Sequence, residues 1–293
     1  MMNLKELRAR QKSVQSIKKL TGALKMVSRS KLGKAQAQWR QAKDSFDNIN
    51  VLMSKLVALY RWHQKDLPVP SNAQAPKVLI VLSSDRGFCG NFNNRLLQAL
   101  RTYLQQTFYD IQVITIGHKI LPALKKDLSI SVMESIHSFK DFSYSHAGHL
   151  LEKLYLSYIQ GHIRGCSVLS MRYHNSLTQE PEICSLLPFD TSSLKEEHAS
   201  LAQWFSGTVP VFEIENDQFF HETLRLFFFS ELTSLAKEHL VSEHNARMMA
   251  MDNASENADN MLGELEKQYN YLRQSSITKE LVEIISGAQA LEG

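Results

Sequence analysis

Glycine and proline are missing from long stretches at both ends of the chain. Residues 1–67 contain no proline and only two glycines, Gly22 and Gly33, and residues 219–262 contain neither residue type. Because both disfavour the interior of a helix, each end is predicted to form one long helix. At 1.5 Å per residue these helices would be about 95 Å and about 110 Å long, whereas a small domain is only ~30 Å across. We therefore expect them to pack against each other as a shaft.

Apolar residues recur in alternating steps of three and four along both predicted helices, which is the spacing of a coiled-coil seam. The alternative is a pair of ordinary helices in a bundle core, but helices longer than about 25 residues are more typical of coiled coils. At the N-terminal end the spacing is strict through Leu32, Ala35, Trp39, Ala42, Phe46, Ile49, Met53, Leu56 and Tyr60, and weaker upstream through Leu7, Val14, Ile17, Thr21 and Leu24. At the C-terminal end it runs through Met251, Ala254, Ala258, Met261, Leu265, Tyr269 and Leu272, and resumes after a slip at Ile277, Leu281, Ile284 and Ala288.

The two ends carry opposite charge. Residues 1–43 contain twelve Lys or Arg and one acidic residue, a net charge of +11, whereas residues 242–293 contain nine acidic and four basic residues, a net charge of −5. Antiparallel pairing would place a basic face beside an acidic one. Exposed ion pairs contribute only about 0–1 kcal/mol each, so we expect the charge to select partner and register.

The composition excludes several classes of protein. Hydrophobic residues make up 43% and charged residues 22% of the 293 residues, as in ordinary soluble proteins, and the formal net charge of +3 is too small for a general nucleic-acid binder. No run of 18 apolar residues predicts a membrane span. The N-terminus lacks the apolar stretch of a secretory signal and is interpreted as part of the mature helix.

The cysteines and histidines do not indicate a disulfide framework or a metal site. Cys89, Cys166 and Cys184 are odd in number and far apart, which favours free thiols in a reducing compartment. His146, His149 and His162 flank a predicted helix, but no carboxylate or cysteine completes a metal-binding spacing. We therefore predict no metal and no cofactor.

The middle of the chain alternates predicted strands and helices, which predicts a mostly parallel sheet with right-handed crossovers. Residues 67–76 are rich in proline and polar residues and are interpreted as a linker. The expected fold class is α/β, with a long antiparallel coiled coil (residues 1–67 and 216–293) and an inserted, Rossmann-like α/β domain (residues 77–208). The predicted strands are 78–82, 112–116, 129–133, 167–173, 183–187 and 209–214, and the predicted helices are 92–109, 118–126 and 149–160.

One glycine-containing loop invites an enzymatic interpretation, because such loops between a strand and a helix often bind phosphate. It matches neither the dinucleotide nor the P-loop fingerprint. Cys89 at a helix start is a possible nucleophile. The structural alternative is a tight turn in which Gly87 and Gly90 adopt positive φ and Asp85 or Asn91 caps the helix. The residues assigned to this structural loop are Ser84, Asp85, Arg86, Gly87, Cys89 and Gly90.

Three segments together resemble the gamma subunit of F-type ATP synthases. Residues 4–36 resemble the opening helix of that family, the stretch Ser-Ser-Asp-Arg-Gly-Phe-Cys-Gly-Asn-Phe-Asn at 83–93 is similar to its Ser-Asp-Arg-Gly-x-Cys-Gly-Gly-x-Asn loop, and residues 242–291 resemble its final helix almost throughout. Their order, spacing and the total length agree with the family, and residues 94–240 match weakly.

The resemblance implies a non-catalytic rotor. In the family, the coiled coil turns inside a hexamer of alternating alpha and beta subunits, while the α/β domain contacts the epsilon subunit and rests on the membrane ring of c subunits. Delta, b and a subunits complete the complex. Ion flow through the membrane part turns the ring and this stalk, which drives ATP synthesis or, in reverse, follows hydrolysis. The resemblance further implies help in regulating ATPase activity and ion flow, and a peripheral position on the cytoplasmic face of a bacterial inner membrane rather than an organellar one.

The resemblance also suggests which residues contact the stationary subunits. The polar contacts of the family fall on the final helix, opposite one stretch of the first helix. Charge-assisted bonds from arginine to acidic loops of beta would be the strongest of these contacts; the alternative is that these positions are only solvated. The candidate contact residues are Leu24, Lys25, Met26, Val27, Arg247, Arg273, Gln274, Thr278 and Glu280.

The chain departs from the family pattern at a few positions. Gly22 and Gly33 stand inside the first helix, where a glycine costs about 1 kcal/mol relative to alanine, so the shaft is expected to be softer there or to contact its bearing differently. Asn91 replaces the second glycine of the loop, which weakens the case for positive φ at that position. The run 227–229 is unusually aromatic and is expected to pack under the α/β domain or to meet another subunit.

Two other classes of function are weighed against the rotor. A nucleotide- or phosphate-using enzyme would place Cys89 or Asp85 at its site in the middle domain. A nucleic-acid binder would use the basic N-terminal arm, but this arm lacks interleaved aromatic residues and its charge lies beside an apolar seam. The sequence favours the rotor over the enzyme, and both over the nucleic-acid binder.

Overall fold

The chain divides into two compact units in the computed structural model. The coil unit comprises residues 1–30 and 247–293, and the sheet unit comprises residues 31–246. Two long helices contribute to both units: α1 (Leu4–Trp62) and α6 (Asn216–Glu292). The structure describes residues 3–62, 72, 74–107, 110–126, 130–136, 144–188 and 216–292.

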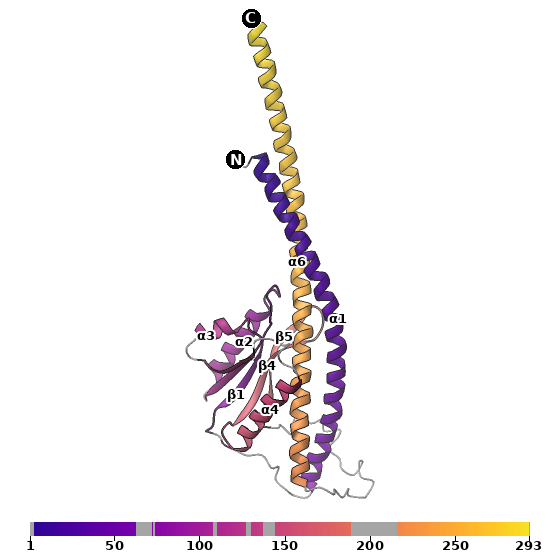
Figure 1. Cartoon of the computed structure of the whole chain (residues 1–293), viewed down its shortest axis with the longest axis vertical. Coiled ribbons are helices and arrows are strands. Elements are labelled where there is room, and N and C mark those ends of the chain that lie inside the picture. The colour runs from indigo at the N-terminus through magenta and orange to yellow at the C-terminus, as the bar shows by residue number, and fades with distance from the viewer. Residues whose placement is uncertain are drawn as a thin grey trace. The chain divides into compact units, whose positions relative to one another are not determined.

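In the coil unit, the start of α1 and the end of α6 run antiparallel. Three contacts show the direction, because the residue number rises along one helix as it falls along the other: Arg8 with Tyr269, Lys18 with Asp259, and Lys25 with Asp252 (Figure 1). The buried α1 positions Leu7, Val14, Thr21 and Ser28 are seven residues apart, and on α6 Met251, Ala258 and Leu265 repeat in the same way. The predicted antiparallel coiled-coil pairing is confirmed.

The seam of the coil unit differs from the prediction at several positions. Ile17 is 50% exposed, whereas Lys18 and Lys25 take the half-buried inward positions and form ion pairs across to α6. On α6, Met261 is exposed and Leu262 packs on the apolar cluster instead. The reason is that a strict 4–3 step from Leu7 fixes which residues face the partner, and a lysine can lay its methylene stem along an apolar seam while its ammonium reaches out.

Beyond Leu272, the resumed seam on α6 lies outside the cover of α1. Ile277, Leu281 and Ile284 are all at least half exposed. The physical reason is length, since the start of α1 already packs against the cluster that contains Leu265 and Leu272. The side chain of Ala288 lies outside the described residues.

The sheet unit is built on a five-stranded sheet of order β3-β2-β1-β4-β5. All neighbouring strands are parallel except the β4–β5 pair, which is antiparallel, so the predicted mostly parallel sheet is confirmed. The strands are β1 (Lys77–Leu82), β2 (Ile111–Ile116), β3 (Ser131–Ile136), β4 (Gly165–Tyr173) and β5 (Gln179–Leu187), and the helices between them are α2 (Phe92–Gln106), α3 (Leu121–Lys126) and α4 (Tyr144–Ile159). A further predicted strand at 209–214 lies outside the described residues.

Several element boundaries were predicted wrongly: β5 begins at Gln179 rather than at residue 183, α4 begins at Tyr144 rather than at residue 149, and β3 ends at Ile136 rather than at residue 133. Helix α3 begins at Leu121 rather than at residue 118, because the Lys119 amide donates to the Ser84 carbonyl and Pro122 suits the first turn of a helix. Strand β3 begins at Ser131 rather than at residue 129, since Gln112 of β2 pairs with Ser131.

Helices cover both faces of the sheet (Figure 1). One core joins Val78, Ile80 and Leu82 of β1 to α1, α4 and α6, and the other joins Leu79 and Val81 to α2 and α3. Burial on both faces explains why β1 is a continuous apolar run rather than an alternating one.

Within the sheet unit, α1 and α6 also pair, and the predicted heptad positions of α1 from Leu32 to Leu56 are all buried or half-buried. The side chain of Tyr60 lies outside the described residues.

The aromatic run at 227–229 resolves the two options left by the sequence: Phe227 and Phe228 are buried in the core, and the ring of Phe227 lies 5.3 Å from that of Phe46. The packing is therefore internal to the chain at these two residues.

We expect Gly33→Ala to stabilise the chain by about 1 kcal/mol, because alanine favours helix and a methyl group at Gly33 meets nothing within 4 Å. Gly22→Ala should behave in the same way. The measurement is the urea unfolding midpoint of the full chain. Gly117→Ala serves as the contrast, since its φ is +88° and the new Cβ would lie 2.2 Å from the Ser83 carbonyl oxygen, so it should destabilise. A Gly33→Ala midpoint at or below that of the wild type would contradict this account of the helix.

Candidate functional site

The loop after β1 is held together by one small polar network. The Ser84 amide donates to Asn93 Oδ1 over 3.2 Å, and Asn93 Nδ2 donates to Ser84 Oγ over 2.8 Å and to Cys89 Sγ over 3.3 Å. Ser84 and Cys89 are buried. The hydroxyl, amide and thiol therefore bind one another across the start of α2, and this arrangement braces a turn rather than presenting a nucleophile.

The backbone of this loop corrects part of the prediction. Gly90 has the predicted positive φ of 59°, but Phe88, not Gly87, is the second left-handed residue, with φ 65°. Asn91 occupies the N-cap position of α2 without a side-chain capping bond. The residue that braces the turn is Asn93, which the capping rule missed because its partner lies nine positions back in the sequence.

The strand order of the sheet reverses between the carboxyl ends of β1 and β4. Ligands of doubly wound sheets bind in a crevice at such a reversal point. The β1–β4 pairing ends at Val81 and Leu169, so the later backbone groups of β4 need other partners. Here side chains of α6 supply them (donor and acceptor listed in turn): the Met171 amide to His239 Nδ1 (3.1 Å), Ser242 Oγ to the Met171 carbonyl (3.2 Å), and the Tyr173 amide to Glu238 Oε1 (2.9 Å).

We call this set of contacts between α6 and the end of β4 the seat of α6, and further polar contacts extend it. Arg172 donates to Glu238 over 3.0 Å and forms a 3.1 Å ion pair with Glu182 of β5, and Asn245 Nδ2 donates to the Ser176 carbonyl over 2.7 Å. His239 is fully buried, and the ring of Phe92 lies 5.1 Å from its own. Helix α6 thus takes the place that a ligand takes in related sheets.

Burial sets the protonation states in this seat. It lowers the pKa of His239 to about 3, against a small opposing effect of the Ser83 backbone, so the imidazole is neutral near pH 7. Burial also raises the pKa of Glu231 to about 7 and raises the pKa of Glu238. A neutral imidazole is what the geometry needs, because Nδ1 must accept the Met171 amide proton.

The other titratable candidates do not form reactive groups. Burial raises the pKa of Cys166 to about 12 and that of Cys184 to about 11, so both thiols stay protonated at neutral pH. All three cysteines are free thiols. Among the residues that the structure describes, no group of three His, Cys, Asp or Glu side chains is placed to hold a metal ion.

The candidate contact residues of the shaft fall on two separate surfaces of the coil unit. Arg273, Gln274, Thr278 and Glu280 are all exposed on α6. Met26 and Val27 on α1 are exposed, Met26 to 75%, while Leu24 is half-buried and Lys25 forms an ion pair with Asp252. Asp252 and Arg273 are 21 residues apart on one helix, which is about 30 Å.

Two details of the α6 contact residues matter for their roles. The Thr278 hydroxyl donates to the Gln274 carbonyl over 3.0 Å, and Ser276 Oγ donates to Glu280 over 3.3 Å, both within the helix. Arg247 differs from the others because it is only 9% exposed and interacts within its own chain.

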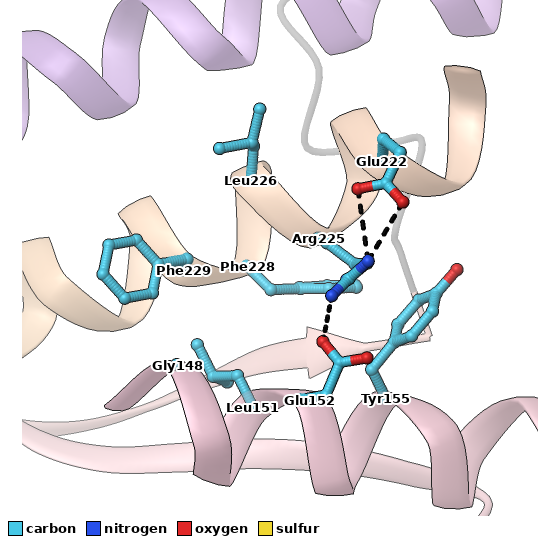
Figure 2. Close-up of a pocket in the computed structure, with 9 residues that line it drawn as sticks. All are labelled: Gly148, Leu151, Glu152, Tyr155, Glu222, Arg225, Leu226, Phe228 and Phe229. Carbon is cyan, nitrogen blue, oxygen red and sulfur yellow. Dashed lines mark hydrogen bonds and ion pairs between the residues drawn. The ribbon is translucent and has the colours of Figure 1, made fainter. Parts of the chain in front are cut away.

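A pocket between α4 and the start of α6 was not predicted from the sequence (Figure 2). Its volume is about 210 Å³, and Arg225 crosses it between Glu152 of α4 and Glu222 of α6, with Nη1 of Arg225 3.0 Å from the Glu222 carboxylate. Nearby, the hydroxyl of Tyr155 bonds to Nδ1 of His221, and burial raises the pKa of Tyr155 to about 12. Both carboxylates engage the guanidinium, so the cluster fastens α4 to α6.

Comparisons with known proteins agree over nearly the whole chain. A family model described as ATP synthase matches residues 3–291. The ATP synthase gamma chain of Pelagibacter ubique is 31% identical over 308 residues, covering 99% of this chain and all of that protein, and the ATP synthase gamma chain of Verminephrobacter eiseniae is 32% identical, covering 99% of this chain and 98% of that protein. The chain belongs to the ATP synthase gamma-chain family.

Solved structures show the same fold as this gamma chain. A chain of the Euglena gracilis mitochondrial ATP synthase (OSCP/F1/c-ring, rotational state 3) superposes with a TM-score of 0.63 at 18% identity, covering 98% of this chain and 94% of that one. A chain of the rotor of the same synthase in rotational state 1 gives 0.59 at 16% identity, covering 94% and 98%. The predicted family, the fold class and the function as a central-stalk rotor subunit of ATP synthase are confirmed.

We expect Asn93→Ala to destabilise the gamma chain by about 1–3 kcal/mol, because it leaves the buried Ser84 amide without its acceptor. Asn91→Ala is the matched control in the same turn, and since Asn91 makes no side-chain cap bond it should change the free energy of unfolding by less than about 0.5 kcal/mol. Urea unfolding of the two variants beside the wild type is the measurement. Equal effects would refute the bracing role of Asn93.

Proposed function

We propose that this gamma chain is a non-catalytic rotor shaft that couples ion-driven rotation of a c ring to ATP synthesis and hydrolysis in an alpha–beta hexamer. The observation that carries the proposal is the uncovered end of α6. The apolar side chains of Ile277, Leu281 and Ile284 follow the seam spacing, yet α1 does not cover them. An exposed apolar surface of this kind is suited to contact with a partner that surrounds the end of the helix, as is expected for a rotor inside the alpha–beta hexamer.

The stationary contacts are proposed on the two surfaces of the coil unit. One surface, toward the C-terminal end of α6, consists of Arg273, Gln274, Thr278 and Glu280. The other, on α1, consists of Met26 and Val27 beside half-buried Leu24 and Lys25. Arg273 is suited to bidentate bonds with carboxylates of beta. Because Arg247 is buried, we propose that it stabilises the shaft internally rather than contacting a partner subunit directly.

The proposal that the chain does no chemistry of its own rests on the sheet unit. The crevice at the strand-order reversal holds α6 side chains rather than an open cavity. In the loop after β1, the Asn93 amide donates hydrogen bonds to both Ser84 Oγ and Cys89 Sγ. These features disfavour the enzyme alternative, and the ion pairs of Lys18 and Lys25 with aspartates of α6 disfavour a free basic arm for nucleic acid.

The proposed partners are the alpha and beta subunits, the epsilon subunit and the c ring, with delta, b and a subunits in the complete complex. The family names and the c-ring complexes among the similar structures support an association with the membrane-bound synthase. In the parts of the chain that the structure describes, no helix is long and apolar enough to cross a membrane. We propose a peripheral position on the cytoplasmic face of a bacterial inner membrane.

Rotation is proposed to act on nucleotide affinity. A shaft that turns within a ring of binding sites favours a different conformation of each site at each angle. A shift between states of a site needs contacts that differ between those states, and by linkage nucleotide occupancy then acts back on the angle of the shaft. The side chains proposed for these contacts are the exposed ones, and their loss should affect coupling rather than the folding of the chain.

The test is Arg273→Ala in a complex reconstituted with alpha and beta subunits of the same organism. We expect the ATPase activity of the complex to fall at least about tenfold, because a charge-assisted contact of about 1.5–3 kcal/mol is lost. The isolated variant should unfold at the wild-type urea midpoint, since Arg273 is exposed. Lys267→Ala, another exposed cation on α6, is the matched control and should leave the activity unchanged. Wild-type activity with Arg273→Ala would contradict the assignment of this residue.

A further inference from the structure

We propose that the seat of α6 on the end of β4 is an acid-sensitive latch, in which neutral His239 holds this part of α6 on the sheet and protonation of His239 releases it. The latch consists of His239, Ser242 and Glu238 on α6 and the backbone of Met171 and Tyr173 on β4. The inference does not depend on the proposed rotor function, because every contact lies within the sheet unit.

The direction of one hydrogen bond makes the latch sensitive to a proton. The Met171 amide donates to Nδ1 of His239 over 3.1 Å, so Nδ1 carries no hydrogen in the latched form. A proton added there would face another N–H group and end the bond. The ring is fully buried and lies at the edge of Phe92, so an imidazolium there would be poorly solvated. Protonation is therefore expected to need separation of α6 from β4.

Charged side chains on the neighbouring elements do not replace that lost bond. The Glu238 carboxylate already accepts from the Tyr173 amide and from Arg172. The causes of the His239 pKa shift include no charged side chain: burial lowers the pKa, and a hydrogen bond with the Ser83 backbone raises it. The titratable and charged groups on the neighbouring stretches of chain are Asp85, Arg86 and Cys89 in the loop after β1, Lys43 on α1, Arg95 on α2, Arg172 and Tyr173 on β4, Glu180 and Glu182 on β5, and Glu231, Lys237, Glu238, Glu243 and His244 on α6.

The sign of the effect follows from the folded and released states. The pKa of His239 is lowered from 6.5 to about 3, so its contribution to the latch is complete above about pH 6.5 and is lost as the pH falls toward 3. Glu231 and Glu238 have raised pKa values, so their charge weakens the seat as the pH rises, which is the opposite direction. Only the difference between the wild type and a variant without His239 isolates the histidine.

The test is amide hydrogen exchange of Met171 and Tyr173 in the full-length chain, corrected for the intrinsic pH dependence of exchange. For a shift from 6.5 to about 3, the protection of the wild type relative to that of His239→Gln should fall about 30-fold between pH 7.5 and pH 5.0. His239→Gln keeps an acceptor that does not titrate, so its own protection should follow only the opposite trend of Glu231 and Glu238. His174→Gln, on an exposed histidine, is the matched control and should keep the full wild-type dependence.

Two further variants keep the test decisive. Ser242→Ala removes one contact of the latch but no titrating group, so it should lower protection at every pH while retaining the pH dependence of the wild type. His239→Asn is a second non-titrating variant, used where glutamine does not fit the buried space. A ratio of wild-type to His239→Gln protection that stays constant between pH 7.5 and 5.0 would overturn the proposal, and so would the same pH dependence in the wild type and in a folded His239→Asn variant.

Discussion

The seam between α1 and α6 is the interaction on which the rest of the structure depends. A helix gains stability in water mainly from packing of one face, and helices of 59 and 77 residues have no domain large enough to enclose them. In each unit the two helices meet this requirement by pairing antiparallel through side chains that are spaced three and four residues apart. In the coil unit that pairing carries small and polar residues such as Thr21, Ser28 and Ala258, so it depends on close approach more than on a large apolar core, and the matched charges help to set its register.

The same α6 helix decides what the sheet unit can do. By lining up Glu238, His239 and Ser242 along one face, it occupies the reversal point of the sheet where a cofactor would otherwise bind. A fold that is widespread among nucleotide-binding enzymes thereby serves here as a rigid support for α6. The partly exposed triad of Arg225, Glu152 and Glu222 fastens α4 to the same helix from another side. Contacts to α6 thus stabilise the sheet unit from two sides.

The sequence was informative where the physics is local. The continuous apolar run of β1 predicts a strand buried on both faces, and the strict spacing from Leu32 to Leu56 predicts a paired helix face; both are confirmed. It misled where two neighbouring residues compete, because a rule that prefers the apolar side chain selects Ile17 over Lys18. It could not reveal Asn93 as the brace of the loop or His239 as the residue that fills the crevice, since their partners are brought close only by folding. The roles of the exposed shaft residues depend on other subunits and remain predictions.

The most direct test of the central claim is single-molecule rotation of this chain in a complex immobilised through its beta subunits. Leu177 is 84% exposed at the β4–β5 turn, so Leu177→Cys offers a site for a probe, while Cys89 and Cys166 are buried. Our account predicts unidirectional rotation of the probe that requires ATP and stops when ATP is removed. A complex that hydrolyses ATP at its normal rate while the probe on this chain stays still would contradict it.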